Sequence, residues 1–421
     1  MALMDLISLG ADKQAVIFDI GAAFTKIGFA GEFSPRHIIR SEIKTMIKGD
    51  LVTSKLFKDN NNIDCNELRE FFHMIYFKYL LVNPKERRVV ICDSILKSIN
   101  VRNLIAQVLF KDFEIISLCF ISSHLLAVFS LGLKTGLVID CGYTETTVVP
   151  IFEELPILSA MEYINLAGKT VHQHINDQIL KNGIVESNGT EKLANSVITS
   201  IDEVVLEDIK TQCCFVGRFS SNLIAVPVKY YINGGLVLNV SGKLRACSLD
   251  ILFQGNDDDQ SITTTILDAI LKCPIDCRKL LAENIVVVGG TCMSTGFLPR
   301  LYSELNHLIT TEPYKDKLFL KKFVFHKTAI PENCSVWLGG AMFSALELLA
   351  EQSISREAYQ LNPKIPDWSS ILSVSKEDLS KSHSEKYKWE GFRKTLPLSN
   401  PKFLPVSYSS ELIKKDFSFV K

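Results

Sequence analysis

The stretch VIFDIGAAFTKIGFAG (residues 16–31) decides the fold, because it joins two apolar runs through a tight turn. Both runs are rich in β-branched and aromatic residues, which favours strands. The first run ends in Asp19-Ile20-Gly21, and the glycine lets the backbone turn sharply. Such a turn suits phosphate and Mg²⁺, since backbone N–H groups can approach phosphate oxygens and the aspartate can hold the ion.

The same unit occurs a second time. The stretch GLVIDCGYTETTVVPIF (residues 136–152) again has an apolar strand, Asp140, Gly142 and a second apolar strand. A single Asp-x-Gly also occurs in ordinary turns, but two in matching contexts indicate an internal duplication. We therefore expect an α/β protein of two duplicated lobes around a nucleotide cleft, with one turn from each lobe at its mouth.

The composition limits the kinds of molecule that the chain is expected to bind and the compartment in which it works. The chain has 421 residues, 47% of them hydrophobic, and a net charge of -1, so no basic surface for nucleic acid is expected. Its 11 cysteines lack paired short spacings, and no signal-peptide pattern precedes them, which indicates a reduced intracellular protein. Residues 115–133 carry no Asp, Glu, Lys or Arg, but their Ser-Ser-His interruption favours a buried strand followed by a buried helix. We therefore expect no membrane insertion.

A third stretch, NIVVVGGTCMSTGFLPRL (residues 284–301), runs from an apolar strand into Gly289 and Gly290, with a helix expected from Gly296 onward. Glycines after a strand allow the backbone to approach a nucleotide closely. An ordinary tight turn between strand and helix is the alternative.

These stretches resemble segments of actin in the same order along the chain. EDIKTQCCFV (residues 207–216) and SVWLGGAMFSALELL (residues 335–349) extend the likeness, which runs from about residue 16 to residue 359. The resemblance implies the actin/hexokinase/chaperone-ATPase fold. Its expected parts are a small lobe of residues 1–122 with residues 330–362 packing back on it, a large lobe of residues 123–329, and a C-terminal tail of residues 363–421.

The resemblance also implies bound ATP or ADP with Mg²⁺. The expected nucleotide-binding positions match the family's motifs and are Asp19, Gly21, Lys26, Asp140, Gly142, Gly168, Lys210, Gly289, Gly290 and Met293. Asp19 and Asp140 are the candidates for the Mg²⁺ site. An empty cleft, whose loops survive as structure, is the alternative.

Several positions depart from actin. Ala22 and Ala23 replace a serine and a glycine, and Tyr143 replaces an aspartate. Ser123 and Thr147 stand where actin has the glutamine and histidine around the attacking water. Hydrolysis needs a water held in line with the γ-phosphate. We therefore expect little or no hydrolysis, no catalytic residue, and a structural role.

Two surfaces bear on polymer contacts. Between residues 37 and 78 the chain is shorter than actin's insertion, and the Gly- and Met-rich loop that contacts the next subunit at the pointed end is missing. Phe129, Gly132 and the helix expected over residues 339–352 match the groove that accepts a neighbour's loop. Met342, Leu346 and Leu349 follow helical spacing and face either this groove or the core. A subunit of this kind keeps the face that accepts one neighbour but has lost the face toward the next, because its pointed-end subdomain is reduced. We therefore expect it to cap a filament.

Within the family, the stretches FFHMIYFKYLLVNPKERRVVI (residues 71–91), LKCPIDCRKLLAEN (residues 271–284) and KIPDW (residues 364–368) are similar to an actin-related subunit at the pointed end of dynactin. The likeness implies the centractin filament and the small dynactin pointed-end subunits as partners, with dynein and its adaptors as indirect ones. It implies a place in the cytoplasm, on the cytoskeleton. The alternatives are a nuclear actin-related subunit of a chromatin-remodelling complex and an active ATPase or kinase of the same fold.

The remaining features are less specific. Residues 363–421 are rich in Ser, Lys and Pro but contain spaced aromatics, so they form either a solvated tail or a segment that orders against a neighbour. Cys273 and Cys277 lack a second ligand pair, and His172 and His174 lie two apart, so neither pair is expected to bind metal.

Overall fold

The structure is a computed structural model that describes residues 13–47, 50–58, 63–187, 189–220, 225–232, 235–255, 259–346, 349–365 and 407–408. Two compact units divide the chain. Unit 1 holds the described residues up to Leu133 and those from Cys334 to 365, and unit 2 holds Lys134–Asn333 with residues 407–408. Most of the tail predicted over residues 363–421 lies outside the described residues.

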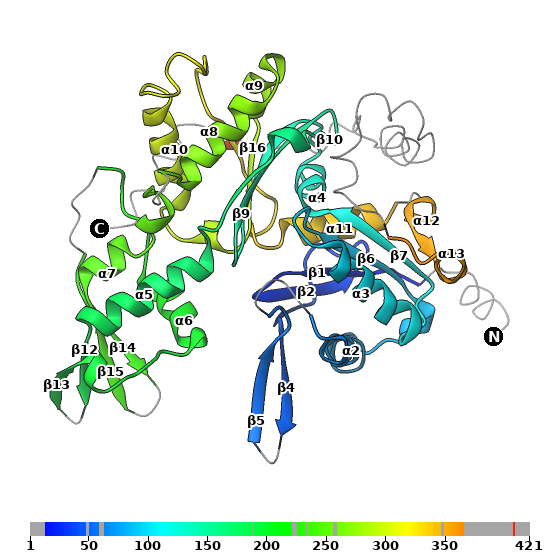
Figure 1. Cartoon of the computed structure of the whole chain (residues 1–421), viewed down its shortest axis with the longest axis horizontal. Coiled ribbons are helices and arrows are strands. Elements are labelled where there is room, and N and C mark those ends of the chain that lie inside the picture. Colours follow the sequence, from blue (N-terminus) through cyan, green and yellow to red (C-terminus); the bar gives the residue numbers. More distant parts are fainter. Residues whose placement is uncertain are drawn as a thin grey trace. The chain divides into compact units, whose positions relative to one another are not determined.

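Unit 1 is built on a six-stranded sheet of order β18-β7-β6-β1-β2-β3 (Figure 1). The strands are β1 (Val16–Ile20), β2 (Phe24–Phe29), β3 (His37–Arg40), β6 (Arg88–Asp93), β7 (Ser117–Ser122) and β18 (Ile354–Ser355). Strands β1, β6 and β7 run parallel, and β2 pairs antiparallel with β1. The carboxyl ends of the parallel strands therefore share the edge at which the first Asp-x-Gly turn lies.

Helices cover both faces of this sheet (Figure 1). The helices of unit 1 are α2 (Cys65–Met74), the π-helical η2 (Ile75–Leu80), η3 (Pro84–Glu86), α3 (Ile99–Lys111), α4 (Ser123–Ser130), α11 (Ser335–Ser344), α12 (Leu349–Gln352) and α13 (Arg356–Leu361). The Phe18 ring centroid lies 5.4 Å from that of Phe72 in α2, whereas Ile17 Cγ2 lies 3.1 Å from where a Cβ atom on Gly340 of α11 would be. Alternate residues of β1 thus face opposite helical layers, which explains its continuous apolar run.

Helix α4 packs within unit 1, so the predicted lobe boundaries are corrected. The Phe129 ring lies 6.4 Å from that of Phe343 in α11. Gly339 of α11 meets α4 so closely that a Cβ atom there would lie 2.2 Å from the carbonyl oxygen of Leu126. The unit boundaries therefore fall after Leu133 and before Cys334, and not after residues 122 and 329. The strand and helix predicted over residues 115–133 are confirmed as β7 and α4.

The single helix expected over residues 339–352 is wrong. Helix α11 ends at Ser344, where Ser344 Oγ donates to the carbonyl oxygen of Gly340 at 2.6 Å. The Ala345 N–H then bonds the Met342 carbonyl oxygen at 3.2 Å, a three-residue spacing that tightens the last turn. Leu349 begins the separate helix α12 and is buried. The spacing of Met342, Leu346 and Leu349 does not define one helical face.

A two-stranded hairpin projects from the rest of unit 1 (Figure 1). Strands β4 (Glu42–Ile47) and β5 (Asp50–Lys55) pair antiparallel over six positions. Its base is tied to α2, because Ser54 Oγ donates to Glu67 Oε1 at 2.7 Å. This hairpin and α2 lie within the shortened segment that the sequence predicted between residues 37 and 78, together with β3 and the start of η2.

Unit 2 repeats the sheet of unit 1. Its main sheet has the order β10-β9-β8-β16-β17-β19, with β11 on β9. The strands are β8 (Gly136–Cys141), β9 (Thr146–Phe152), β10 (Leu155–Pro156), β11 (Glu162–Ile164), β16 (Ile285–Val288), β17 (Phe325–His326) and β19 (Ser407–Tyr408). The β8–β9 hairpin has parallel neighbours β16 and β17, just as β1–β2 has β6 and β7. The predicted α/β fold with duplicated sheets is confirmed.

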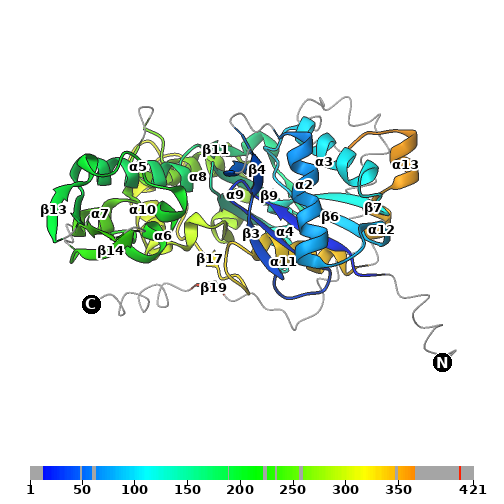
Figure 2. The same cartoon turned by 90° about the horizontal axis from the view of Figure 1, so that it is seen from below.

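Helices and a second sheet complete unit 2 (Figure 2). The helices are η4 (Leu158–Ala160), α5 (Gly168–Asn182), η5 (Ala194–Ser196), α6 (Glu203–Cys213), α7 (Gly242–Cys247), η6 (Asp250–Leu252), α8 (Ile262–Lys272), α9 (Ile275–Ala282), η7 (Thr291–Met293) and α10 (Phe297–Leu308). The second sheet has the order β13-β12-β15-β14 and uses β12 (Ile184–Ser187), β13 (Thr190–Leu193), β14 (Val228–Ile232) and β15 (Leu236–Val240). In the part of the chain that the structure describes, no helix is long and apolar enough to cross a bilayer.

Candidate functional site

Loop 1, residues 21–23, turns β1 back into β2. The Gly21 N–H donates to the Phe24 carbonyl oxygen at 3.2 Å, and a Cβ atom on Gly21 would lie 2.8 Å from that oxygen. A side chain at this position would therefore force the turn to shift. Asp19 and Lys26 face each other across the hairpin, and Lys26 Nζ lies 2.8 Å from Asp19 Oδ2. Three predicted site residues are thus brought together, and two of them form an ion pair.

Ser41, just after β3, holds loop 1 in shape. Its Oγ donates to the Gly21 carbonyl oxygen at 2.6 Å, and its N–H donates to the Ala23 carbonyl oxygen at 3.0 Å. Among the described residues, the N–H groups of Ala22 and Ala23 have no hydrogen-bond partner. The alanines therefore remove a side-chain hydroxyl but leave two backbone donors, which fits a phosphate cradle.

A buried ion pair lies beside loop 1. Asp93, at the end of β6, pairs with Arg102 of α3, and both side chains are almost fully buried. Lys97 Nζ lies 3.6 Å from Asp93 Oδ1 and donates to the Ile20 carbonyl oxygen at 3.3 Å. The end of β1 is therefore tied to its parallel neighbour by a side chain that the sequence motifs did not single out.

Loop 2, residues 142–145, is the equivalent turn of unit 2. The Gly142 N–H donates to the Glu145 carbonyl oxygen at 3.1 Å, and the Gly142 carbonyl oxygen accepts from Thr291 Oγ1 at 2.6 Å and from the Gly168 N–H at 3.2 Å. Gly289 has φ +102, and a Cβ atom there would lie 2.2 Å from the Cys141 carbonyl oxygen and 2.8 Å from Asp140 Oδ1. Four predicted residues, Asp140, Gly142, Gly168 and Gly289, therefore meet.

Tyr143 ties loop 2 to helices α5 and α6. Its hydroxyl donates to Glu203 of α6. Its ring lies 5.6 Å from that of His172 in α5, edge to face, and its Cδ2 lies 3.3 Å from where a Gly168 Cβ would be. Tyr143, which replaces the family's aspartate, therefore packs against α5 and bonds α6, and so connects loop 2 to both helices.

Lys210 of α6 is paired inside unit 2. Its Nζ lies 2.7 Å from Glu207 Oε2, and the side chain is 7% exposed. His172 Nε2 lies 2.9 Å from the same carboxylate oxygen. Burial acts to raise the pKa of Glu207, but the contacts with His172 and Lys210 outweigh it and lower this pKa to about 2. Glu207 is therefore a carboxylate at neutral pH.

The segment from Gly289 to Met293 leads into α10. Gly290 has open space around its Cα atom, and the Met293 side chain is largely exposed. Gly296 takes φ +87 at the start of α10, and Val216 donates from its N–H to the Thr295 carbonyl oxygen at 2.8 Å. The predicted helix after Gly296 is confirmed, and this bond ties its start to the segment that follows α6.

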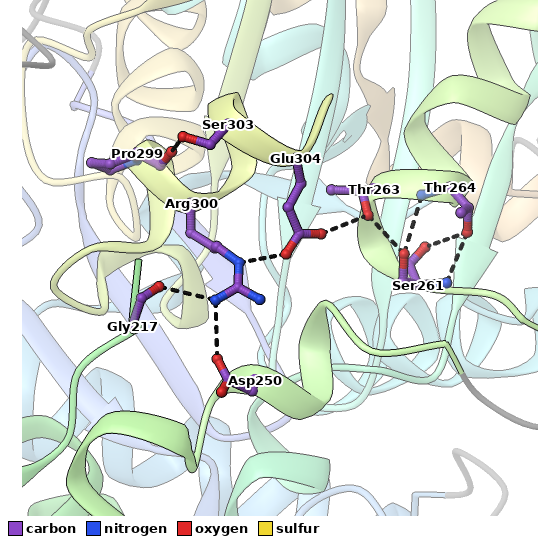
Figure 3. Close-up of polar contacts among 9 residues, drawn as sticks. All are labelled: Gly217, Asp250, Ser261, Thr263, Thr264, Pro299, Arg300, Ser303 and Glu304. Atoms are coloured by element: carbon purple, nitrogen blue, oxygen red, sulfur yellow. Dashed lines mark hydrogen bonds and ion pairs between the residues drawn. The ribbon is translucent and has the colours of Figure 1, made fainter. Parts of the chain in front are cut away.

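Arg300 anchors α10 through a polar network (Figure 3). Its Nη1 donates to the Gly217 carbonyl oxygen at 3.0 Å and to Asp250 Oδ1 at 3.3 Å, and its Nε donates to Glu304. Thr263 Oγ1 donates to Glu304 Oε2 at 3.3 Å. Burial raises the pKa of Glu304 and of Asp250, although Arg300 opposes the rise. Two carboxylates, Asp250 and Glu304, therefore share the guanidinium of Arg300.

The positions expected to lack hydrolytic groups carry buried hydroxyls. Ser123 Oγ lies 3.3 Å from Nδ1 of His124, and burial lowers the pKa of His124 to about 4. Thr147 is buried in β9 opposite Asp140. Both hydroxyl side chains are shorter than the glutamine and histidine that actin has there.

The fit to a nucleotide can be tested residue by residue. Asp19, Gly21 and Lys26 lie in unit 1, and the other seven predicted residues lie in unit 2. Asp19 and Asp140 end equivalent strands and offer carboxylate oxygens, the ligands that Mg²⁺ prefers beside water and phosphate oxygens. Within the described ranges no group of three or more His, Cys, Asp or Glu side chains is close enough to form a metal site by itself. Asp19 in unit 1 and Asp140 in unit 2 thus each offer a ligand type that suits Mg²⁺ carried by phosphates.

Comparison with known proteins gives the family. The sequence model described as "Actin" matches residues 10–362. The chain is 27% identical over 431 aligned residues to "Actin-related protein 10" of Dictyostelium discoideum, with 86% of this chain and 90% of the relative covered. It is 24% identical over 382 residues to "Putative actin-29" of the same organism, covering 82% and 94%. The predicted resemblance is confirmed, and the chain belongs to the actin family.

Proposed function

We propose that the chain is a structural actin-related subunit of dynactin that caps the pointed end of the centractin minifilament. In this proposal it docks the small pointed-end subunits and so serves dynein-driven transport along microtubules. The likeness to an actin-related protein over most of the chain supports a role among actin-related subunits. The proposed location is the cytoplasm, on the cytoskeleton.

The β4–β5 hairpin is the observation that carries the capping proposal. Each of its strands has six residues, and α2 follows after a short connection. A filament subunit needs two different complementary faces, one toward each neighbour. A short hairpin in place of actin's longer pointed-end segment supports loss of one face, which stops further addition.

The second part of the proposal is a nucleotide with a structural role. Loop 1 in unit 1 and loop 2 in unit 2 each offer phosphate-binding backbone groups, and Asp19 and Asp140 each offer a carboxylate to the Mg²⁺ that ATP or ADP carries. The ion neutralises phosphate charge, and the backbone donors of Ala22 and Ala23 orient the phosphates. Ser123 and Thr147 do not position water, so turnover is slow or absent.

Thermal unfolding and phosphate release test the nucleotide proposal. Ligand that binds the folded chain at a hundredfold excess over its dissociation constant stabilises it by about 2.7 kcal/mol, so MgADP or MgATP should raise the melting temperature. Asp19→Asn and Asp140→Asn should each reduce that rise. Phosphate release at a rate comparable to that of actin filaments would contradict the structural role.

Elongation of centractin filaments tests the capping proposal. The purified chain should stop growth at one filament end at substoichiometric amounts and leave the other end growing. Incorporation along the filament, or equal binding to both ends, would contradict it.

A further inference from the structure

Lys210 is the single cation among the seven predicted nucleotide-binding positions of unit 2, and its ammonium group is already paired. Its Nζ contacts Glu207 Oε2 at 2.7 Å, one helical turn earlier on α6. The Lys210 side chain is 7% exposed and that of Glu207 is 23% exposed. A nucleotide phosphate or hydroxyl that approached Lys210 would therefore compete with a carboxylate held in place.

Glu207 has a second partner that keeps it in position. His172 of α5 contacts the same carboxylate oxygen through Nε2 at 2.9 Å and is 3% exposed. Within the described residues, neither ring nitrogen of His172 has a hydrogen-bond partner, so the Nε2 contact with Glu207 is a close approach without hydrogen-bond geometry. His172 and Lys210 thus both lie against the same carboxylate oxygen of Glu207, and Lys210 makes the shorter contact.

Tyr143 fixes the same cluster to loop 2. Its hydroxyl bonds Glu203, four residues before Glu207 on α6, and its ring packs edge to face on His172. Loop 2, α5 and α6 are thus joined through side chains of this chain alone.

We propose that Glu207 is an internal anion that competes with nucleotide for Lys210 and thereby weakens the binding of charged nucleotides to unit 2. This inference rests on the nucleotide part of the proposed function and names the residue that sets the affinity. The ligand class concerned is the adenine nucleotide with its phosphates. An uncharged nucleoside is not repelled by the carboxylate and gains little from a freed ammonium.

Titration calorimetry on the full chain tests the proposal with MgADP and adenosine as probes. Glu207→Gln keeps the size of the side chain and removes its charge. It should bind MgADP at least about tenfold more tightly than the unaltered chain, while adenosine affinity changes less than about threefold. Glu191→Gln, at an exposed position of β13, removes the same charge elsewhere in unit 2 and should leave both affinities unchanged.

Two further variants keep the test decisive. Glu207→Gln combined with Lys210→Gln should lose the gain, because the freed ammonium is gone. If Glu207→Gln fails to fold by circular dichroism, Glu207→Asp, which retracts the carboxylate by one methylene, should show a smaller gain of the same kind.

The outcomes separate this inference from the proposed function. If the unaltered chain binds MgADP and Glu207→Gln binds it no more tightly, or gains equally for adenosine, the inference is overturned and the structural nucleotide stands. If no variant binds MgADP, both are overturned.

Discussion

Loop 1 and loop 2 occupy equivalent places in the two units, yet different contacts hold them. Each loop joins two antiparallel strands beside a parallel neighbour, and each has a glycine whose N–H closes the turn. Across the β1–β2 hairpin Asp19 forms an ion pair with Lys26, whereas Asp140 lies opposite the hydroxyl residue Thr147. Loop 2 is held instead by Thr291 and Tyr143.

The difference shows what duplication preserves. The backbone plan depends on strand pairing and on glycines where a side chain would collide, and both units keep it. The side chains around each loop depend on neighbours that only one unit has, such as α5 and α6 beside loop 2. Four tests sharpen or break this comparison.

The largest effect is expected for Gly289→Ala beside loop 2. With φ +102 and a Cβ position 2.2 Å from the Cys141 carbonyl oxygen, an alanine must displace backbone. The free energy of unfolding of unit 2 should fall by about 3–5 kcal/mol, measured by urea denaturation. Gly290→Ala is the control, because φ is -77 and nothing lies within 4 Å. Equal effects at the two positions would contradict the geometry.

Next in size is the pH dependence contributed by Glu207. Its folded pKa of about 2 lies below the ordinary value of 4.5, so it adds stability that is present above about pH 4.5 and is lost as the pH falls through about 2. The contribution near neutral pH should be about 2–3 kcal/mol. The stability difference between the unaltered chain and Glu207→Gln should shrink on acidification from pH 5 to pH 2. A constant difference would show that Glu207 is not held by His172 and Lys210.

A smaller change in stability is expected for alanine substitutions at Gly21 and Gly142, the equivalent glycines of loop 1 and loop 2. A Cβ atom would lie 2.8 Å from the Phe24 carbonyl oxygen at Gly21, but 3.2 Å from the Glu145 carbonyl oxygen at Gly142. Gly21→Ala should therefore lower the free energy of unfolding by about 1–2 kcal/mol, and Gly142→Ala should lower it by less than about 1 kcal/mol. Trp337 fluorescence, measured with Trp368 and Trp389 replaced by Phe in every variant, reports the unfolding of unit 1, and far-ultraviolet circular dichroism reports the whole chain. The reverse order would mean that loop 2 is the tighter turn.

The smallest effect is expected for Tyr143→Phe. The ring can still pack on His172, so only the hydrogen bond to Glu203 is lost. The free energy of unfolding should fall by about 0.5–1.5 kcal/mol. No change in Tyr143→Phe would mean that the ring alone bridges loop 2 to α6.

Sequence alone predicted the backbone and missed much of the side-chain pairing. The two Asp-x-Gly hairpins, the strand and helix over residues 115–133 and the helix after Gly296 follow local patterns of apolar residues and glycines. The break between α11 and α12 was missed, because residues 335–349 are apolar enough to read as one helix.

The contacts of Glu207 show which side-chain pairs can be predicted from the sequence and which cannot. Its spacing of three residues from Lys210 was a usable signal, since such residues are neighbours on a helix surface. Its contact with His172, 35 residues earlier and on another helix, had no local signal. Pairs of this kind depend on how α5 packs against α6, which only the folded structure gives.

The measurement that tests the central claim most directly is affinity purification of the tagged full chain from cell extract, with partners identified by mass spectrometry and the tag located by negative-stain imaging. The account predicts recovery with centractin and the small pointed-end subunits of dynactin, with the label at one end of each filament. Recovery with chromatin-remodelling ATPases, or label distributed along the filament, would contradict the capping role.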